Sequence, residues 1–457
     1  MNKKVHLIAV GGSAMHNMAL ALHEKGFEIS GSDDEINEPS KSRLAKAGLL
    51  PAETGWFPGK LHSGLDAVIL GMHARADNPE LAKAKELGLK IYSYPEYIYE
   101  ATKDKTRIVI GGSHGKTTIT AMILHVMNHH KIETDFLVGA QLEGFNTMVS
   151  LSNTSKYAVI EGDEYLASPI DRRPKFHLYR PNIAILSGIA WDHINVFPTF
   201  ENYVEQFTKF ISLIESGGHL IYCAEDKMLE EVCRKENNPH ISMTGYRVPP
   251  HEIQQGTTYL HVDGKNIPLQ IFGNHNLMNL NGARLVCNTI GLSNDQFYEA
   301  IQSFKGAAKR LELVCKTNDF NFYKDFAHSP SKLKATTNAV KNQFGDRHIV
   351  ACMELHTFSS LNEDFLKEYN GSMNLADEAI VYFNPHTVAH KKLKEITVEQ
   401  VHNAFQRKDL KVFTKSAGVT DYLKSKQWSN SVLLMMSSGN FDGVDFNELG
   451  KEISKRQ

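Results

Sequence analysis

A glycine-rich turn between an apolar strand and a helix is the feature that most restricts how this chain can fold. An apolar stretch at 106–110 leads into Gly111-Gly112-Ser113-His114-Gly115-Lys116-Thr117-Thr118, and a helical run at 119–127 follows. Glycines there let backbone N–H groups surround phosphate oxygens at the positive end of the helix, while Lys116 reaches the outer phosphates and Thr117 can bind magnesium. The segment therefore predicts an α/β domain that binds a nucleotide through residues 112–118.

The match to the phosphate-loop pattern G-x-x-x-x-G-K-[ST] is partial, because Ile110 stands where the pattern has its first glycine. The alternative is a glycine-rich strand-to-helix turn with an exposed lysine. The Gly-Lys-Thr-Thr run begins a predicted helix directly after a predicted strand, and this context favours nucleotide binding.

Short apolar strands alternate with helical lengths along the whole chain, which is typical of α/β folds with parallel sheets. At about 150 residues per domain, the 457 residues correspond to about three domains. We predict a Rossmann-like N-terminal domain at 1–105, a P-loop α/β ATPase domain at 106–308 and a Rossmann-like C-terminal α/β domain at 309–457. Short β-like segments between 258 and 271 suggest antiparallel strands appended to the central sheet.

The charge and the cysteine content of the chain argue against some classes of binding partner and against an oxidising compartment. Lys plus Arg total 50 against 52 for Asp plus Glu, so no global positive field drives binding to nucleic acid or anionic membranes. The five cysteines include no C-x-x-C pair, which argues against a disulfide framework. No apolar run approaches the roughly 20 residues of a membrane helix, and the first apolar stretch is too short for a signal peptide. We expect a cytoplasmic protein.

Two strand ends of the central domain carry candidate magnesium ligands. Glu161 ends the stretch 156–161, and His193 follows the stretch 183–187. Because ligands gather at the carboxyl ends of parallel strands, Glu161 and His193 could join Thr117 around one or two Mg²⁺ ions. The neighbouring acids leave alternatives open: Asp163 and Glu164 could be solvated loop charges, and Asp192 could be a helix N-cap.

The N-terminal domain has a different glycine turn. It comprises Gly11, Gly12, Ser13, Ala14 and Met15, and Ser32 and Asp33 follow about twenty residues on, at the distance expected in a dinucleotide fold. The first and last glycines of G-x-G-x-x-G are alanines here. These departures weaken the hypothesis that the domain binds a nicotinamide dinucleotide. An oxidoreductase remains a rival hypothesis, but a nucleotide diphosphate on the helix N-terminus needs only backbone amides and the helix dipole.

The C-terminal domain contributes Arg310 and Asp325. Arg310 could clamp a phosphoryl group through two parallel hydrogen bonds, and Asp325, at a strand end, could accept hydrogen bonds from ribose hydroxyls. The alternative for Arg310 is a surface salt bridge with Glu312, worth under about 1 kcal/mol.

Taken in order, these motifs resemble the Mur ligase superfamily, the ATP-dependent amide-bond-forming enzymes of bacterial cell-wall precursor synthesis. The ordered set covers essentially the whole chain. It comprises the glycine-rich first strand, G-S-D at 31–33, G-S-H-G-K-T-T at 112–118, E-G-D-E at 161–164, D-H at 192–193, G-N-H-N-L-M-N at 273–279, R-L-E at 310–312 and D-F-A-H-S-P at 325–330.

The resemblance implies a role for each matching position. The turn at 11–15, with Ser32 and Asp33, would hold a UDP-sugar, and residues 112–118 would hold ATP. Thr117, Glu161 and His193 would bind magnesium. His275, Asn276 and Asn279 would lie near the adenine and ribose, with Arg310, Asp325 and His328 supplied by the C-terminal domain. The catalytic residues would be Lys116, Glu161, His193 and Arg310. Several relatives carry a carbamylated lysine near the position of Phe207 or Thr208; Lys209 is close, and we assign none.

Within the superfamily, residues 163–165, 171–176, 353–355 and 436–441 resemble the murein peptide ligase subfamily of peptidoglycan recycling. That likeness implies that ATP activates UDP-N-acetylmuramate as an acyl phosphate, which the amine of L-alanyl-γ-D-glutamyl-meso-diaminopimelate then attacks. Arg172, Arg173 and Lys175 could pair with the peptide carboxylates, or they could form a solvated basic loop. The chain departs from the relatives' pattern at Lys324, Ser329, His356 and Thr357.

Two alternatives stay open at this point. The first is a UDP-N-acetylmuramate:L-alanine ligase of de novo peptidoglycan synthesis. The second is a nucleotide-binding switch that hydrolyses ATP without joining anything. In each case we expect a monomer or a weak homodimer that acts on small molecules.

Overall fold

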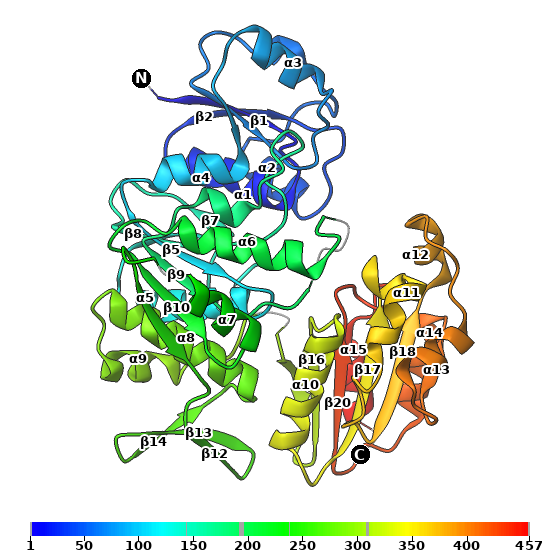
Figure 1. The fold of residues 1–457 in the computed structure, drawn as a ribbon. Coiled ribbons are helices and arrows are strands. Elements are labelled where there is room, and N and C mark those ends of the chain that lie inside the picture. The colour runs from blue at the N-terminus through cyan, green and yellow to red at the C-terminus, as the bar shows by residue number, and fades with distance from the viewer. Residues whose placement is uncertain (1, 143, 192–195, 237, 308–309, 456–457) are drawn as a thin grey trace. The chain divides into compact units, whose positions relative to one another are not determined.

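The computed structural model describes residues 2–142, 144–191, 196–236, 238–307 and 310–455 (Figure 1). The described residues form two compact units. The first comprises 1–247 with 278–301, and the second comprises 248–277 with 302–457. The predicted domain boundaries stay predictions, and the one at 308/309 falls outside the described residues. The α/β architecture with mainly parallel sheets agrees with the predicted fold class.

The N-terminal sheet is parallel, with the strand order β2-β1-β3-β4. Its strands are β1 (Lys4–Ile8), β2 (Glu28–Ser32), β3 (Ala67–Leu70) and β4 (Ile91–Ser93). The helices between and after them are α1 (Ser13–Glu24), α2 (Ser40–Lys46), α3 (Pro79–Glu86) and α4 (Tyr94–Thr102), with the 3₁₀ turn η1 (Pro58–Lys60). β3 is buried at every position, as expected for a parallel strand covered on both faces.

The central sheet has the order β11-β10-β9-β5-β8-β6-β7. Its strands are β5 (Thr106–Gly111), β6 (Thr134–Leu137), β7 (Val149–Ser150), β8 (Tyr157–Glu161), β9 (Ile183–Leu186), β10 (His219–Cys223) and β11 (Ser242–Tyr246). Its helical elements are α5 (Lys116–His129), η2 (Lys175–Leu178), α6 (Phe200–Ser212), α7 (Lys227–Lys235), α8 (Asn274–Thr289) and α9 (Asn294–Ile301). β5 pairs in parallel with β8 and β9, so the loop that follows it lies in the middle of the carboxyl edge of the sheet.

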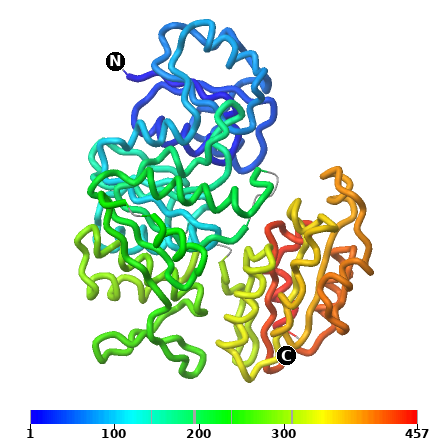
Figure 2. The backbone as a smooth tube through the Cα atoms, in the orientation of Figure 1, coloured from blue at the N-terminus to red at the C-terminus, as the bar shows by residue number. Residues whose placement is uncertain are grey.

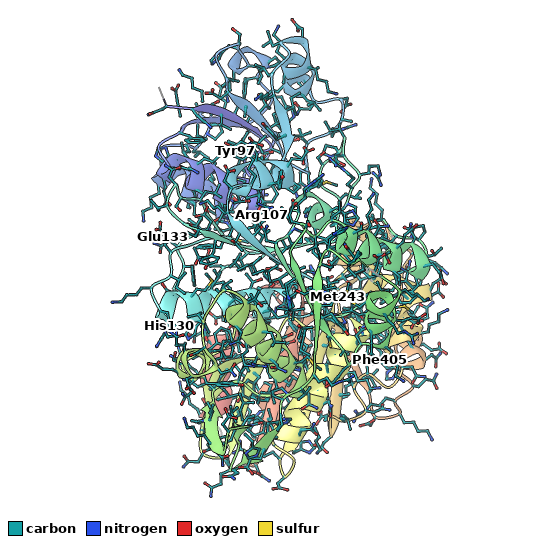
Figure 3. The ribbon with its side chains drawn as sticks, turned by 60° about the vertical axis from the view of Figure 1, so that its left-hand side comes forward. Tyr97, Arg107, His130, Glu133, Met243 and Phe405 are labelled. Carbon is teal, nitrogen blue, oxygen red and sulfur yellow. The ribbon has the colours of Figure 1, made fainter. Side chains whose placement is uncertain are left out.

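The buried guanidinium of Arg107, on β5, links the end of α4 to the segment that follows η2 (Figure 3). Its Nη1 donates to the carbonyls of Thr102 at 3.2 Å and Lys103 at 2.7 Å, which end α4. Its Nε donates to the carbonyls of Tyr179 at 3.0 Å and Arg180 at 2.9 Å. One side chain on β5 thus satisfies carbonyls that the end of a helix leaves open, and the backbone passes directly from α4 into the central sheet (Figure 2).

The second compact unit contains a separate antiparallel sheet and the C-terminal parallel sheet. The antiparallel sheet comprises β12 (His251–Gln254), β13 (Thr257–Val262) and β14 (Lys265–Leu269). Our prediction that these strands extend the central sheet is wrong, because they pair only with one another among the described residues. Their side chains alternate between apolar and polar, and this pattern identifies strands without saying which sheet they join.

The C-terminal sheet has the order β15-β16-β20-β17-β18-β19. Its strands are β15 (Glu312–Lys316), β16 (Phe320–Asp325), β17 (His348–Leu355), β18 (Glu378–Phe383), β19 (Lys411–Phe413) and β20 (Ser431–Met436). The helices are α10 (Pro330–Gln343), α11 (Glu363–Leu366), α12 (Pro385–His390), α13 (Val398–Phe405), α14 (Ser416–Ser425) and α15 (Phe446–Ser454), with η3 (Ser359–Leu361) and η4 (Lys367–Tyr369). β15 runs antiparallel to β16.

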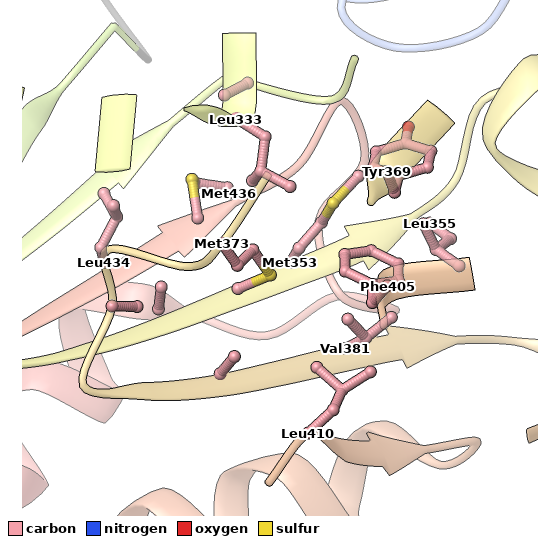
Figure 4. Close-up of a cluster of buried hydrophobic side chains, with 14 of the residues drawn as sticks. Leu333, Met353, Leu355, Tyr369, Met373, Val381, Phe405, Leu410, Leu434 and Met436 are labelled. Atoms are coloured by element: carbon pink, nitrogen blue, oxygen red, sulfur yellow. The ribbon is translucent and has the colours of Figure 1, made fainter. Parts of the chain in front are cut away.

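Successive residues of β17 feed cores on opposite faces of this sheet. Met353 packs with Leu333 and Met436 in one core (Figure 4), whereas Cys352 packs with Trp428 in the other. This period of two is the geometry of an extended strand, and it explains why β17 and β18 read as continuous apolar runs.

None of the described helices combines the length and the apolar character needed to cross a bilayer.

Candidate functional site

The turn between β5 and α5 has a conformation that requires glycine at two positions. Gly112 has φ 118° and Gly115 has φ 75°. A Cβ atom would lie 2.3 Å from Ser187 Oγ if added to Gly112, and 2.3 Å from Asn279 Oδ1 if added to Gly115. Glycine adopts positive φ without steric cost, so the backbone can curve tightly at the start of the helix. Asn279, which we predicted near the nucleotide, therefore lies against the predicted phosphate loop.

Lys116 is held inside this turn by a buried carboxylate. Its Nζ donates to Gly112 O at 2.7 Å and to Glu164 Oε2 at 2.6 Å, and Glu164 Oε1 accepts from Gly112 N at 3.0 Å. The Glu164 side chain is only 1% exposed. The sequence left Glu164 open as a solvated loop charge, whereas the structure makes it the partner of the lysine. The E-G-D-E motif, which begins at the last residue of β8, is the sequence feature that could have identified Glu164 as a site residue.

Burial and charge act in opposite directions on this pair. Burial by itself lowers the pKa of Lys116, but the carboxylates of Glu164, Asp163 and Glu161 raise that pKa above its ordinary value. Burial also raises the pKa of Glu164, and Lys116 offsets this only in part. The first shift favours a charged pair and the second a neutral acid. We favour the ion pair, because Glu164 accepts hydrogen bonds from both Nζ and Gly112 N, and such bonds stabilise a carboxylate.

Thr117 and Glu161 lie together beside the turn. Thr117 Oγ1 donates to Glu161 Oε1 at 2.8 Å, and Glu161 Oε2 accepts from Gly139 N at 2.8 Å. A hydroxyl and a carboxylate are oxygen ligands of the kind Mg²⁺ prefers, with waters and phosphate oxygens completing its shell, so these two residues fit a magnesium ion. The other predicted ligand, His193, lies outside the described residues, as does Asp192. Among the described residues no cluster of three or more His, Cys, Asp and Glu side chains could hold a metal by itself.

Ser113 and His114 are anchored from neighbouring elements. Ser113 Oγ lies 2.9 Å from Tyr203 Oη on α6 and accepts from Ala190 N at 2.8 Å. The carbonyl of His114 accepts a hydrogen bond from Ser187 Oγ, just beyond β9. The turn is therefore held from β9 and α6 as well as by its own backbone.

The basic residues that we predicted to bind a peptide are largely paired within the protein. Arg173 pairs with Asp171 at 2.6 Å and with Glu96 at 3.1 Å, and Lys175 pairs with Asp163 at 2.6 Å. Arg172 is exposed. Arg173 also lines a cavity of about 460 Å³ together with Lys209 of α6 and the buried His177.

The N-terminal glycine turn and Asp33 are joined directly. Asp33 Oδ2 accepts from Gly11 N at 2.7 Å. Burial raises the pKa of Asp33, and its hydrogen bonds to backbone N–H groups oppose the rise. Gly12 precedes α1, whose first residues are Ser13, Ala14 and Met15. Ser32 Oγ accepts from Lys60 Nζ at 3.0 Å. The predicted UDP-sugar residues therefore gather at one helix N-terminus, a position suited to a diphosphate.

Residues predicted to reach ATP from the C-terminal domain belong to the second compact unit, and there Asp325 serves the backbone. Its Oδ2 accepts from Leu311 N at 2.6 Å and its Oδ1 from Ala327 N at 2.8 Å. Arg310 lies over the Phe326 ring at 4.7 Å from its centroid, and His328 Nδ1 lies 2.8 Å from Phe326 O. Arg310 and His328 thus both contact Phe326, the residue after Asp325.

His275 and Asn276 also belong to the second unit. Asn276 Nδ2 donates to Phe272 O at 2.9 Å. Burial lowers the pKa of His275, and Asp325 opposes the shift. Asn279, one turn further along α8, belongs to the first unit, so the predicted ATP set is divided between the two units.

Two of the positions where the sequence departs from the superfamily pattern, Lys324 and His356, lie beside carboxylates. Lys324 pairs with Glu312 at 2.9 Å, and His356 Nδ1 lies 3.7 Å from Glu354 Oε1. The buried hydroxyl of Ser329 has no hydrogen-bond partner among the described residues.

Three family models match consecutive parts of the chain. They are "Mur ligase family, catalytic domain" at 4–106, "Mur ligase middle domain" at 110–287 and "Mur ligase, glutamate ligase domain" at 309–439. The UDP-N-acetylmuramate–L-alanine ligase of Clostridium kluyveri is 30% identical over 394 residues, covering 83% of each chain.

Solved structures are similar over nearly the whole length. The murein peptide ligase of Psychrobacter arcticus is 23% identical with a TM-score of 0.64, covering 100% of this chain and 98% of that one. The UDP-N-acetylmuramate-alanine ligase of Thermotoga maritima is 20% identical with a TM-score of 0.70, covering 99% and 98%. At these identities the likeness shows a shared fold.

Proposed function

This chain belongs to the Mur ligase family and is an ATP-dependent ligase that forms carbon–nitrogen bonds, and we propose that it joins UDP-N-acetylmuramate to L-alanyl-γ-D-glutamyl-meso-diaminopimelate. The observation that carries the proposal is the paired arrangement of Lys116 with Glu164 and of Thr117 with Glu161 at a turn built to curve around phosphates. Such a site suits phosphoryl transfer to a carboxylate, the first step of ATP-dependent amide formation.

Each residue has a distinct task in the proposed reaction. The ammonium of Lys116 leaves Glu164 for the phosphates of ATP and stabilises the negative charge on the transferring group. Thr117 and Glu161, with His193, would hold Mg²⁺, which neutralises charge on the phosphate oxygens. The carboxylate of the muramyl lactoyl group attacks the γ-phosphorus of ATP, the bond from that phosphorus to the β–γ bridging oxygen breaks, and ADP leaves, so that an acyl phosphate is formed. The amine then attacks the acyl carbon, and phosphate leaves.

The choice of the tripeptide rests on sequence likeness and on charge. Residues 163–165 and 171–176 resemble murein peptide ligases, and the exposed Arg172 offers positive charge to a substrate that carries several carboxylates. The second candidate is L-alanine as the amine, and the relative that is 30% identical supports it by its name. A cytoplasmic location and a monomeric or weakly dimeric state stay predictions.

Phosphate release tests the proposal. The purified chain is supplied with ATP, Mg²⁺ and UDP-N-acetylmuramate, and either the tripeptide or L-alanine is added. Release that requires the muramyl nucleotide and the tripeptide supports the proposal. Release with L-alanine and not with the tripeptide establishes the second candidate, and release that needs no amine indicates an ATP-hydrolysing switch.

A variant tests the peptide side. Arg172→Gln should raise KM for the tripeptide several-fold and leave KM for ATP unchanged. Arg234→Gln, at an exposed position on α7, is the matched control that removes the same charge elsewhere. An unchanged tripeptide KM in Arg172→Gln assigns Arg172 to the solvated surface.

A further inference from the structure

The loop of residues 138–148, described except for 143, joins β6 to β7. Its first residues contact Glu161, the carboxylate that we predicted to bind magnesium. Gly139 N donates to Glu161 Oε2 at 2.8 Å, while Thr117 Oγ1 donates to the other oxygen of the same carboxylate at 2.8 Å. The orientation of Glu161 therefore depends on this loop as much as on the phosphate loop. A shift of Gly139 would release one of the two hydrogen bonds that fix the carboxylate.

The far end of the loop is held by Arg43, a half-buried residue of α2. Its Nη2 donates to Gln141 Oε1 at 3.1 Å and to the carbonyl of Asn146. Its Nη1 donates to Asn17 Oδ1 at 3.1 Å, and that same oxygen accepts from Met148 N at 3.0 Å. One guanidinium thus joins α2, α1 and the loop.

Arg43 makes these contacts with neutral acceptors. No ion pair with a carboxylate is formed by Arg43 within the part of the chain that the structure describes. A guanidinium offers five N–H donors in a fixed planar fork. That geometry lets one side chain hold several carbonyls in a set arrangement, which a lysine cannot reproduce.

The same contacts extend to the predicted UDP-sugar turn. Asn17 Nδ2 donates to Ser13 O at 2.8 Å. His16 Nδ1 lies 3.0 Å from Gly12 O, and His16 Nε2 faces two donors, Asn17 Nδ2 at 3.0 Å and Arg43 Nη1 at 3.4 Å. Nε2 must therefore accept, so Nδ1 carries the proton and donates to Gly12 O. Burial, reinforced by Arg43, lowers the pKa of His16 and keeps the ring in this neutral form.

We propose that Arg43 is a positioning residue that couples binding at the turn Gly11–Ser13 to the orientation of Glu161. A ligand on the turn fixes the first residues of α1, and Asn17 and Arg43 then hold the end of the 138–148 loop. The beginning of that loop in turn holds Glu161 beside Thr117. The inference rests on the proposed function for the identity of the two ligands.

Coupling of this kind is measurable as a change in affinity. The Kd of a non-hydrolysable ATP analogue with Mg²⁺ is measured with and without saturating UDP-N-acetylmuramate. In the unaltered protein the muramyl nucleotide should tighten analogue binding roughly 10-fold, within the usual range for coupled sites. By linkage, the analogue must tighten binding of the muramyl nucleotide by the same factor.

Arg43→Gln should abolish this coupling and change each separate Kd less than about 3-fold, because neither ligand is expected to touch Arg43. Arg43→Lys should not restore it, since a lysine lacks the planar fork. Lys46→Gln, at an exposed position on the same helix, is the matched control and should keep the full coupling. Melting curves establish whether each variant is folded. If Arg43→Gln does not fold, Gln141→Ala replaces it as the test, because it removes one partner of Arg43 from the loop and should weaken the coupling.

The outcomes separate this inference from the proposed function. If both ligands bind and the coupling is absent from the unaltered protein or survives in folded Arg43→Gln, the role of Arg43 is refuted. A purely structural role would lower the melting temperature of Arg43→Gln and leave the coupling factor unchanged. If UDP-N-acetylmuramate does not bind at all, the proposed function fails, and the inference fails with it.

Discussion

The carboxyl edges of the central sheet and of the C-terminal sheet carry similar polar residues and use them differently. At the central edge, Glu164 pairs with Lys116 and Glu161 with Thr117. At the C-terminal edge, Glu354 Oε2 accepts from Ser437 Oγ and from Phe441 N. Each edge therefore has a buried or half-buried carboxylate just where ligands gather in folds of this kind.

The difference lies in what the carboxylates hold. At the central edge their partners are a cation and a hydroxyl of the predicted phosphate loop, which phosphate and magnesium can take over. At the C-terminal edge Glu354 and Asp325 accept hydrogen bonds from backbone N–H groups of the protein's own loops. Loss of these hydrogen bonds would destabilise the conformation of those loops. The same topological position can thus serve chemistry or support the fold, and the partner atoms decide which.

The largest expected effect comes from removing the cation of the central edge. Lys116→Ala should reduce ligase activity roughly 10³-fold, because one preorganised charge on the transferring phosphoryl group is lost. It should also destabilise the protein by about 3–5 kcal/mol, because the buried carboxylate of Glu164 loses the cation that balances its charge and keeps only the hydrogen bond from Gly112 N. Phosphate release and denaturant unfolding measure the two effects.

A double variant separates these effects. Lys116→Ala/Glu164→Gln should recover most of the stability and none of the activity. Lys324→Ala is the matched change in the second unit, where the partner Glu312 is 40% exposed, and it should cost under about 1 kcal/mol. Full activity in Lys116→Ala would remove the basis for assigning phosphate chemistry to the central edge.

Removing the buried acid of the C-terminal edge should act on stability. In Glu354→Ala, the Phe441 N–H and the Ser437 hydroxyl lose their acceptor, at a cost of about 1–3 kcal/mol for each buried group. The Kd of an ATP analogue at the phosphate loop should not change in protein that remains folded. A large loss of analogue affinity with unchanged unfolding free energy would mean that Glu354 serves binding.

Mild acid should weaken the first unit through His177 of η2, which stacks on Phe176. Burial lowers the pKa of His177 to about 4 from an ordinary 6.5. The unfolded chain therefore takes up a proton before the folded one as pH falls below 6.5, and the folded state loses about 2 kcal/mol by pH 5 relative to pH 8. The loss levels off below about pH 4.

The variant His177→Gln should reduce this dependence when unfolding free energies are compared between pH 8 and pH 5, and His16, whose pKa burial also lowers, should keep part of it. His240→Gln, an exposed control, should retain it. Equal pH slopes in His177→Gln and the unaltered protein would contradict the assignment of the acid sensitivity to this residue.

The smallest effect concerns Asp325. Asp325→Asn leaves one acceptor oxygen for the N–H groups of Leu311 and Ala327 and the hydroxyl of Thr336, so it should cost about 1 kcal/mol of stability. The KM for ATP should rise only modestly if the carboxylate serves the backbone. A rise in this KM well beyond the loss of stability would instead support the predicted contact with ribose.

Parts of the fold were readable from the sequence because local patterns specify them. The apolar runs that became β5, β8, β9, β17 and β18 are buried on both faces, and residues 116–129 form the helix expected after the glycine turn. The segments predicted as antiparallel strands between 258 and 271 correspond to β13 and β14, whereas β12 was not predicted and the sheet was misassigned. Pairing between distant strands leaves no trace in the side-chain alternation of either one.

The sequence by itself determined the tight turn between β5 and α5, since glycines at 112 and 115 at a strand-to-helix junction permit the positive φ angles that the turn has. Only the tertiary structure decided which acids face that turn. Glu164 and Asp163 are neighbours in the chain, yet Glu164 is buried against Lys116 and Asp163 pairs with Lys175. The side chains of these two neighbours have different partners in the fold, so the role of each acid follows from its tertiary contacts and not from its position in the motif.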